Sequence, residues 1–212
     1  MQKKLQEEEY TMRTIKVYSF DELSSEAREK ACQQVGNSMT DNAWWYDDTF
    51  DLFVERCKDY GMTIDVEDIQ FTGFGSQGDG ASFTCDDIDV EKLLQSLGIK
   101  MSDGLKEKVL DYIEVNIIRT SYRVYHERTV HVQILLEDAL EEEEEGIIQY
   151  IHDITDTLEF KLENLKDDLC QQLYNDLRQE YDYFHSAEYV DEVAYENNML
   201  FLANGLVYDW GE

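Results

Sequence analysis

The fold is decided by residues 147–185, IIQYIHDITDTLEFKLENLKDDLCQQLYNDLRQEYDYFH. Apolar side chains recur there at every third or fourth position, which is the period of an α-helix with one apolar face. They are Ile147, Ile151, Ile154, Leu158, Leu162, Leu165, Leu169, Leu173, Leu177, Tyr181 and Phe184. The spacing predicts one long amphipathic helix (about 147–185), or two helices nearly end to end. Its apolar stripe is expected to pack on a sheet or, as an alternative, to form the seam of a dimer.

Shorter helical and β-rich segments surround this stretch. Caps, glycines and apolar periodicity predict helices at 24–34, 42–60, 89–97, 105–115 and 187–197, with Gly36 just past the end of the first. Alternating and β-branched segments predict a strand at 13–19 and hairpins that pair 64–74 with 81–85 and 117–125 with 130–136. The dipeptide Asn204-Gly205 predicts a further hairpin within 199–210.

Together these segments predict an α+β fold. We expect an antiparallel sheet of hairpins packed with several helices, including the long amphipathic one. Polar residues 1–11 are expected to form a flexible N-terminal tail, and 12–212 a single α+β domain, because no linker or internal repeat interrupts them.

The chain is strongly acidic, with 48 Asp and Glu against 18 Lys and Arg, a formal net charge of −30. Hydrophobic residues make up 42% and aromatic residues 12%, which are too many for a disordered acidic tail. Because phosphate contacts need Lys and Arg, the charge argues against direct binding to nucleic acid or to an anionic membrane. It favours basic partners, above all proteins that bind nucleic acid. Adaptation to high salt is the competing explanation.

The negative charge is concentrated in one part of the chain. Residues 137–192 contain 19 acidic and three basic side chains, a local net charge of −16. Within the long helix, acidic residues step by three or four positions and therefore share one face: Asp153, Asp156, Glu159, Glu163 and Asp167. Their spacing of ~5–6 Å approaches that of DNA phosphates, which advance by ~3.4 Å per nucleotide. We expect these five to bind a partner, supported by Glu141, Glu142, Glu143, Glu144 and Glu145.

No known catalytic, nucleotide-binding or metal-binding motif is present, so neither an enzyme nor a cofactor is expected. His126 and His131 could face each other across a hairpin, but a third ligand is not evident, and no metal site is expected. The four scattered cysteines (Cys32, Cys57, Cys85 and Cys170) fit reduced thiols, several of them in the core.

A glycine-rich loop offers an alternative site. Its backbone amides could cradle an anion, with polar side chains adding contacts; the residues concerned are Gly75, Ser76, Gln77, Gly78, Asp79 and Gly80. The simpler interpretation is a tight hairpin that needs glycine for its backbone conformation.

Several segments resemble a family of small acidic bacteriophage proteins. They are YSFDELS at 18–24, the Trp44-Trp45 pair, FTGFGSQGDGASF at 71–83 and, more loosely, 197–205. The resemblance implies a phage origin and a place in the cytoplasm of the bacterial host cell. Phages use strongly acidic proteins against host defences, as inhibitors of restriction enzymes or CRISPR effectors.

The predicted function is therefore a non-enzymatic phage inhibitor. Its acidic surface would mimic DNA or RNA and occupy the basic channel of a host nucleic-acid-binding defence protein. Two alternatives remain open. One is a protein that binds a nucleotide signal of host immunity through the loop at 73–80. The other is a dimeric phage adaptor, with the long helix at the homodimer or partner interface.

Overall fold

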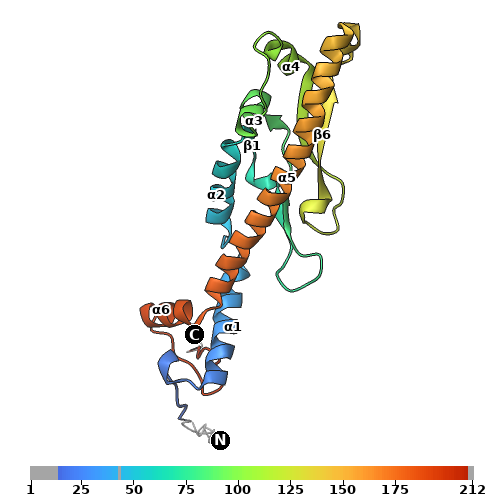
Figure 1. The fold of residues 1–212 in the computed structure, drawn as a ribbon. Helices are drawn as coiled ribbons and strands as arrows, with labels where there is room; N and C mark the ends of the chain where they lie inside the picture. The colour runs from blue at the N-terminus through green and yellow to red at the C-terminus, as the bar shows by residue number, and fades with distance from the viewer. Residues whose placement is uncertain (1–13, 43, 210–212) are drawn as a thin grey trace, which may run out of the picture. The chain divides into compact units, whose positions relative to one another are not determined.

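A computed structural model describes residues 14–42 and 44–209 of the chain (Figure 1). The chain folds into two compact units, which are described separately below. Among the described residues, unit 1 comprises 14–42 and 181–209, and unit 2 comprises 44–180. The predicted tail at 1–11 lies outside the described residues, and the single domain over 12–212 stays a prediction.

Unit 1 is mostly helical. It contains η1 (Phe20–Glu22), α1 (Ser25–Thr40), the last residues of α5 (Glu145–Phe184) and α6 (Ala187–Glu196). Its core brings an early and a late segment of the chain together: Phe201 is fully buried, contacts the Phe20 ring and forms an antiparallel bridge with Tyr18. The predicted hairpin at 199–210 appears as a turn closed by a single bridge between Phe201 and Val207.

The first helix differs from its prediction. The sequence predicts an end before Gly36, yet α1 continues to Thr40 with Gly36 inside it. A Cβ on Gly36 would lie 2.5 Å from the ring of His185, so this glycine makes room for a neighbouring side chain. The His185 ring is held there by stacking on Tyr181 and by contacts with Asn37 and with the Tyr181 carbonyl.

Unit 2 combines helices with short antiparallel strand pairs. Its helices are α2 (Asp47–Lys58), α3 (Val90–Ser96), α4 (Lys106–Tyr112), most of α5, and the 3-10 turns η2 (Val66–Asp68), η3 (Glu127–Thr129) and η4 (Asp138–Glu142). Its strands are β1 (Met62–Thr63), β2 (Ile69–Phe71), β3 (Ala81–Phe83), β4 (Asp87–Ile88), β5 (Ile113–Arg119) and β6 (Val130–Leu136). The α+β prediction is confirmed.

The strands form three two-stranded ladders: β1 with β4, β2 with β3, and β5 with β6. The β2–β3 hairpin joins the predicted segments, with Phe71 opposite Ala81. The strand predicted at 117–125 begins at Ile113 and ends at Arg119. Every second side chain from Ile113 is buried in the core (Ile113, Val115 and Ile117), which is the period of a strand. The chain is therefore already a strand at 113–115, where the predicted helix at 105–115 was expected to continue. That helix, α4, ends at Tyr112.

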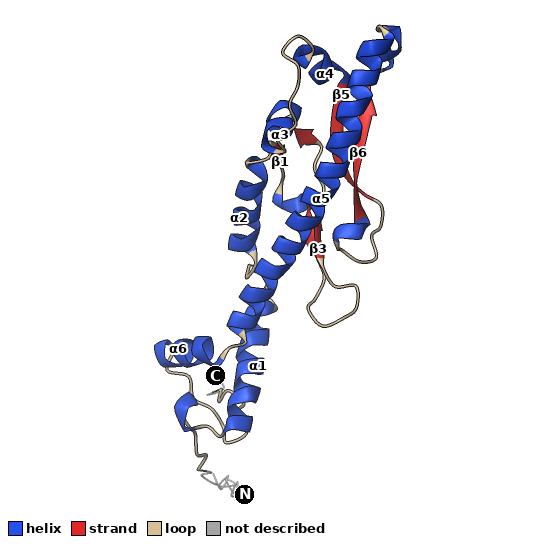
Figure 2. Ribbon diagram, viewed as in Figure 1, coloured by secondary structure: helices blue, strands red, loops and turns tan. Residues whose placement is uncertain are grey.

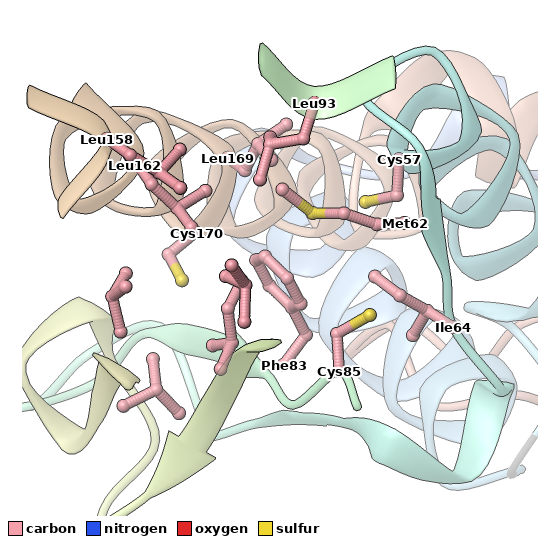
Figure 3. Packing of buried hydrophobic residues seen from close by; sticks show 14 of the residues in the cluster. Cys57, Met62, Ile64, Phe83, Cys85, Leu93, Leu158, Leu162, Leu169 and Cys170 are labelled. Atoms are coloured by element: carbon pink, nitrogen blue, oxygen red, sulfur yellow. The ribbon is translucent and has the colours of Figure 1, made fainter. Parts of the chain in front are cut away.

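Helix α5 confirms the long amphipathic prediction. It is 40 residues long, and in unit 2 it runs beside the β5–β6 hairpin (Figures 1 and 2). Its buried residues repeat at helical spacing: Ile151, Ile154, Leu158, Leu162, Leu169, Leu173 and Leu177. They meet the strands and α3 in one apolar core, so the chain itself covers the stripe (Figure 3).

Three of the four cysteines lie in this core. Cys57, Cys85 and Cys170 are buried and free, and Figure 3 shows them among apolar side chains. Burial raises the pKa of the Cys85 and Cys170 thiols to about 12. The fourth, Cys32, is buried and free in unit 1. Among the described residues, no helix combines the length and the apolar character needed to cross a membrane.

Candidate functional site

The five acidic residues predicted on the long helix share one side of α5. They step by three, three, four and four residues, so they follow the helical turn along one side of the helix. Asp153, Asp156, Glu159 and Asp167 are exposed, while Glu163 is half-buried. We call this strip of five residues the α5 acidic face.

Two members of the α5 acidic face have an internal partner. Lys166 is only 2% exposed, and its ammonium lies 2.8 Å from Glu163 and 2.7 Å from Asp167. The same ammonium donates to the carbonyls of Glu127 and Val130, at 3.0 and 3.1 Å. Glu163 also accepts a hydrogen bond from the backbone N–H of Val132 in β6. These contacts fasten α5 to the β5–β6 hairpin.

The electrostatics of this cluster favour the charged forms. Burial works against the ammonium of Lys166, but hydrogen bonds to Asp167 and Glu163 outweigh it and raise the pKa of Lys166. Partial burial works against the carboxylate of Glu163, but Lys166 and the Val132 N–H more than compensate and lower the pKa of Glu163. Glu163 and Asp167 therefore serve the fold and neutralise a buried cation.

The other three members remain available for an external partner. Asp156 and Glu159 are exposed and have no ion pair or side-chain hydrogen bond within the described residues. Asp153 accepts a hydrogen bond from the Gln149 amide, at 2.9 Å, and keeps its charge uncompensated. Asp153 and Glu159 are six positions apart on a continuous helix, about 9 Å at ~1.5 Å per residue.

The sequence-based prediction did not include an exposed aromatic side chain that lies in the same region, Phe160. Phe160 is 71% exposed and follows Asp156 by one helical turn. Phe160 lies between Leu158 and Leu162 in the sequence and is out of step with the apolar stripe. This mismatch was the signal that could have identified it. Aromatic residues, phenylalanine among them, are enriched in protein interfaces.

The acidic run before α5 is structured, and its members differ in role. Glu141 and Glu142 belong to η4, and Glu145 begins α5. Glu143 pairs with Lys108 and accepts a hydrogen bond from the Tyr112 hydroxyl, and these two contacts lower the pKa of Glu143. Glu141, Glu142, Glu144 and Glu145 are exposed and unpaired within the described part of the chain. Four of the five thus add to the negative surface.

In the glycine-rich loop, the backbone amides that could bind an external anion already bind the carboxylate of Asp79. Asp79 accepts hydrogen bonds from the amides of Gly75 and Ser76, at 2.8 and 2.6 Å. Gly78 has a φ of +104°, and a Cβ on Gly80 would lie 2.5 Å from His126. The backbone conformation at Gly78 and the close contact at Gly80 therefore both favour glycine. Gln77 is exposed on the same loop.

Metal ligands do not gather among the described residues: no group of three or more His, Cys, Asp or Glu side chains is arranged to hold an ion. His126 accepts a hydrogen bond from the Arg128 N–H through Nδ1, and His131 lies opposite Ile118 in the β5–β6 register.

A family model described as "Domain of unknown function (DUF8835)" matches residues 45–187, which is more than half of the chain and includes all of the α5 acidic face. No curated protein and no solved structure shows significant similarity to the chain.

Proposed function

Because the chain belongs to the DUF8835 family, whose function is unknown, we propose its function from its own acidic surface. It is a phage-encoded, non-enzymatic inhibitor of a host nucleic-acid-binding defence protein, such as a restriction enzyme or a CRISPR effector. It acts in the cytoplasm of the bacterial host cell. The observation that supports this proposal is the row of exposed, uncompensated carboxylates Asp153, Asp156 and Glu159 on a helix that the core holds in place.

The mechanism follows from charge density and rigidity. Carboxylates on successive turns present negative charge at intervals of ~5–6 Å, close enough to phosphate spacing to fit a row of Lys and Arg. Like charges at this spacing destabilise an isolated helix. The buried apolar stripe of α5 offsets that cost, so the carboxylates stay aligned before the partner arrives. Long-range attraction then speeds association, and salt weakens it.

A displacement assay with matched charge reversals tests the proposal. A fluorescently labelled DNA duplex or guide RNA is bound to each purified defence protein of a panel, and its release by the chain is followed by anisotropy. We expect the triple variant Asp153→Lys, Asp156→Lys and Glu159→Lys to lose displacement by about 100-fold or more, because three favourable charge contacts become repulsive.

The control reverses three exposed acids of α6, with Glu188→Lys, Asp191→Lys and Glu192→Lys, which change the net charge by the same amount. It should retain displacement within a few-fold. Equal loss in both variants would show that net charge alone acts, and full activity of the α5 variant would refute the proposal.

A further inference from the structure

A polar groove opens in unit 2 beside β5, where Cys85 forms an antiparallel bridge with Ile117. Its volume is about 1020 Å³. Five carboxylate side chains from three separate parts of the sequence line it: Asp65, Glu67, Asp68, Asp86 and Glu114. None of the five belongs to the α5 acidic face.

Within the described part of the chain these carboxylates form no direct ion pair, although the charge of Arg119 attracts that of Asp68. The ion pairs of the described chain include none of the five. Arg119 also lines the groove, but its guanidinium donates to Ser82, at 3.0 Å, and stacks 4.8 Å from the centre of the Tyr125 ring. The groove therefore keeps a concentrated negative charge.

A buried amide in the groove lacks one of its hydrogen bonds. Asn116 lines the groove and is only 8% exposed. Its Nδ2 donates to Glu114, at 2.9 Å, while its Oδ1 is buried and accepts no hydrogen bond within the described part of the structure. Native proteins rarely leave such an acceptor unpaired, so it points to a donor that enters from outside.

An exposed aromatic ring completes the set of groups. Tyr122 lines the groove, is 77% exposed and lies in the loop between β5 and η3. A tyrosine face attracts cations, and it suits the flat guanidinium of arginine better than the compact ammonium of lysine. Several carboxylates and one carbonyl acceptor also match a group that carries five N–H donors and no acceptor.

We propose that this groove binds an arginine side chain presented by an exposed segment of a basic protein. The carboxylates supply attraction, the Tyr122 ring supplies a stacking surface, and the Asn116 carbonyl accepts a hydrogen bond from the guanidinium. The inference does not depend on the α5 acidic face, which uses different residues.

The test is an NMR titration of the isotopically labelled full chain in about 0.15 M salt, which suppresses non-specific attraction between exposed charges. The probes are acetyl-Gly-Arg-Gly-amide, its lysine counterpart and methylguanidinium as a free guanidinium with the same single charge. We expect the arginine peptide to shift amide signals around the groove, at 65–70 and 116–122, and to bind several-fold more tightly than the lysine peptide. Shifts spread over the α5 acidic face, equal binding of both peptides, or methylguanidinium binding more tightly than the arginine peptide would overturn the proposal.

Two matched pairs of variants locate the site. Asp65→Asn with Glu67→Gln should weaken the arginine peptide about fivefold, while Asp156→Asn with Glu159→Gln, the same charge change on α5, should weaken it less than twofold. Tyr122→Ala should weaken it about three- to tenfold, while Tyr195→Ala, a comparably exposed tyrosine of unit 1, should have no effect.

The four changed carboxylates are exposed, and their side chains have no partner among the residues that the structure describes, so both double variants should fold. If the two variants of either matched pair weakened binding of the arginine peptide equally, the proposal that it binds in the groove would be refuted. If the peptide binds the groove as expected but the chain does not displace nucleic acid in the assay above, only the mechanism proposed for the α5 acidic face is refuted.

Discussion

At the scale of the residue, Lys166 decides how two acidic side chains are used. A nearly buried ammonium must be paired, because an isolated charge in the core is very costly. Glu163 and Asp167 provide that pairing, and two carbonyls complete the hydrogen bonds. The sequence placed both carboxylates among the partner-binding residues, since spacing alone does not reveal a cation that lies beneath them.

This cluster makes the stability of the protein depend on pH in a defined direction. The pKa of Glu163 lies below its ordinary value, so its contribution is complete above the unfolded pKa of about 4.3 and is lost as the pH falls through the folded pKa. We expect Glu163→Gln to lower the free energy of unfolding by about 1–2 kcal/mol at pH 7. Urea unfolding from pH 7 to pH 3 should show this difference shrinking toward zero.

The control is Glu159→Gln, which neutralises an exposed and unpaired neighbour on the same helix. It should change the free energy of unfolding by less than about 0.5 kcal/mol at any of these pH values. A difference for Glu163→Gln that stays constant with pH would contradict the assigned ion pair.

At the scale of the element, Gly36 shows how packing can extend a helix past a glycine. In an exposed helix interior, Gly→Ala stabilises by about 0.5–1 kcal/mol. In α1 the sign should reverse, because a Cβ at this position would meet the His185 ring at 2.5 Å. We expect Gly36→Ala to destabilise the protein by about 1–3 kcal/mol, measured by thermal or urea unfolding.

The same substitution in a His185→Ala background provides the control. With the ring removed, Gly36→Ala should become neutral or stabilising, so the double-mutant cycle should give a large coupling energy. Independent, additive effects of the two substitutions would contradict the packing of this ring against α1.

At the scale of the whole molecule, the charge of −30 makes both stability and binding depend on salt. Added salt should raise the stability of the fold and weaken the proposed binding. Self-repulsion opposes the compact state, and dissolved ions screen it. We expect the melting temperature to rise by several degrees between about 0.01 M and 0.5 M NaCl, measured by circular dichroism. The proposed displacement of nucleic acid should weaken over the same range.

The Asp153→Lys, Asp156→Lys and Glu159→Lys variant should show a smaller rise, because it reduces the charge density on α5. A melting temperature that falls or stays constant with salt would contradict the view that exposed, unpaired carboxylates dominate the surface.

Periodicity and composition, which are local properties of the chain, were enough to establish the α+β class, the extent of α5 and the concentration of acid around it. The β2–β3 hairpin could also be located from the sequence, since turn residues lie next to the strands that they join. The internal partners of Glu163, Asp167 and Glu143, and the binding of Asp79 to the amides of its own loop, became visible only in the folded chain. The folded chain alone brings together the groove carboxylates of 65–68, Asp86 and Glu114. The reason is physical: which charges are paired depends on contacts between residues distant in sequence, and no local pattern records them.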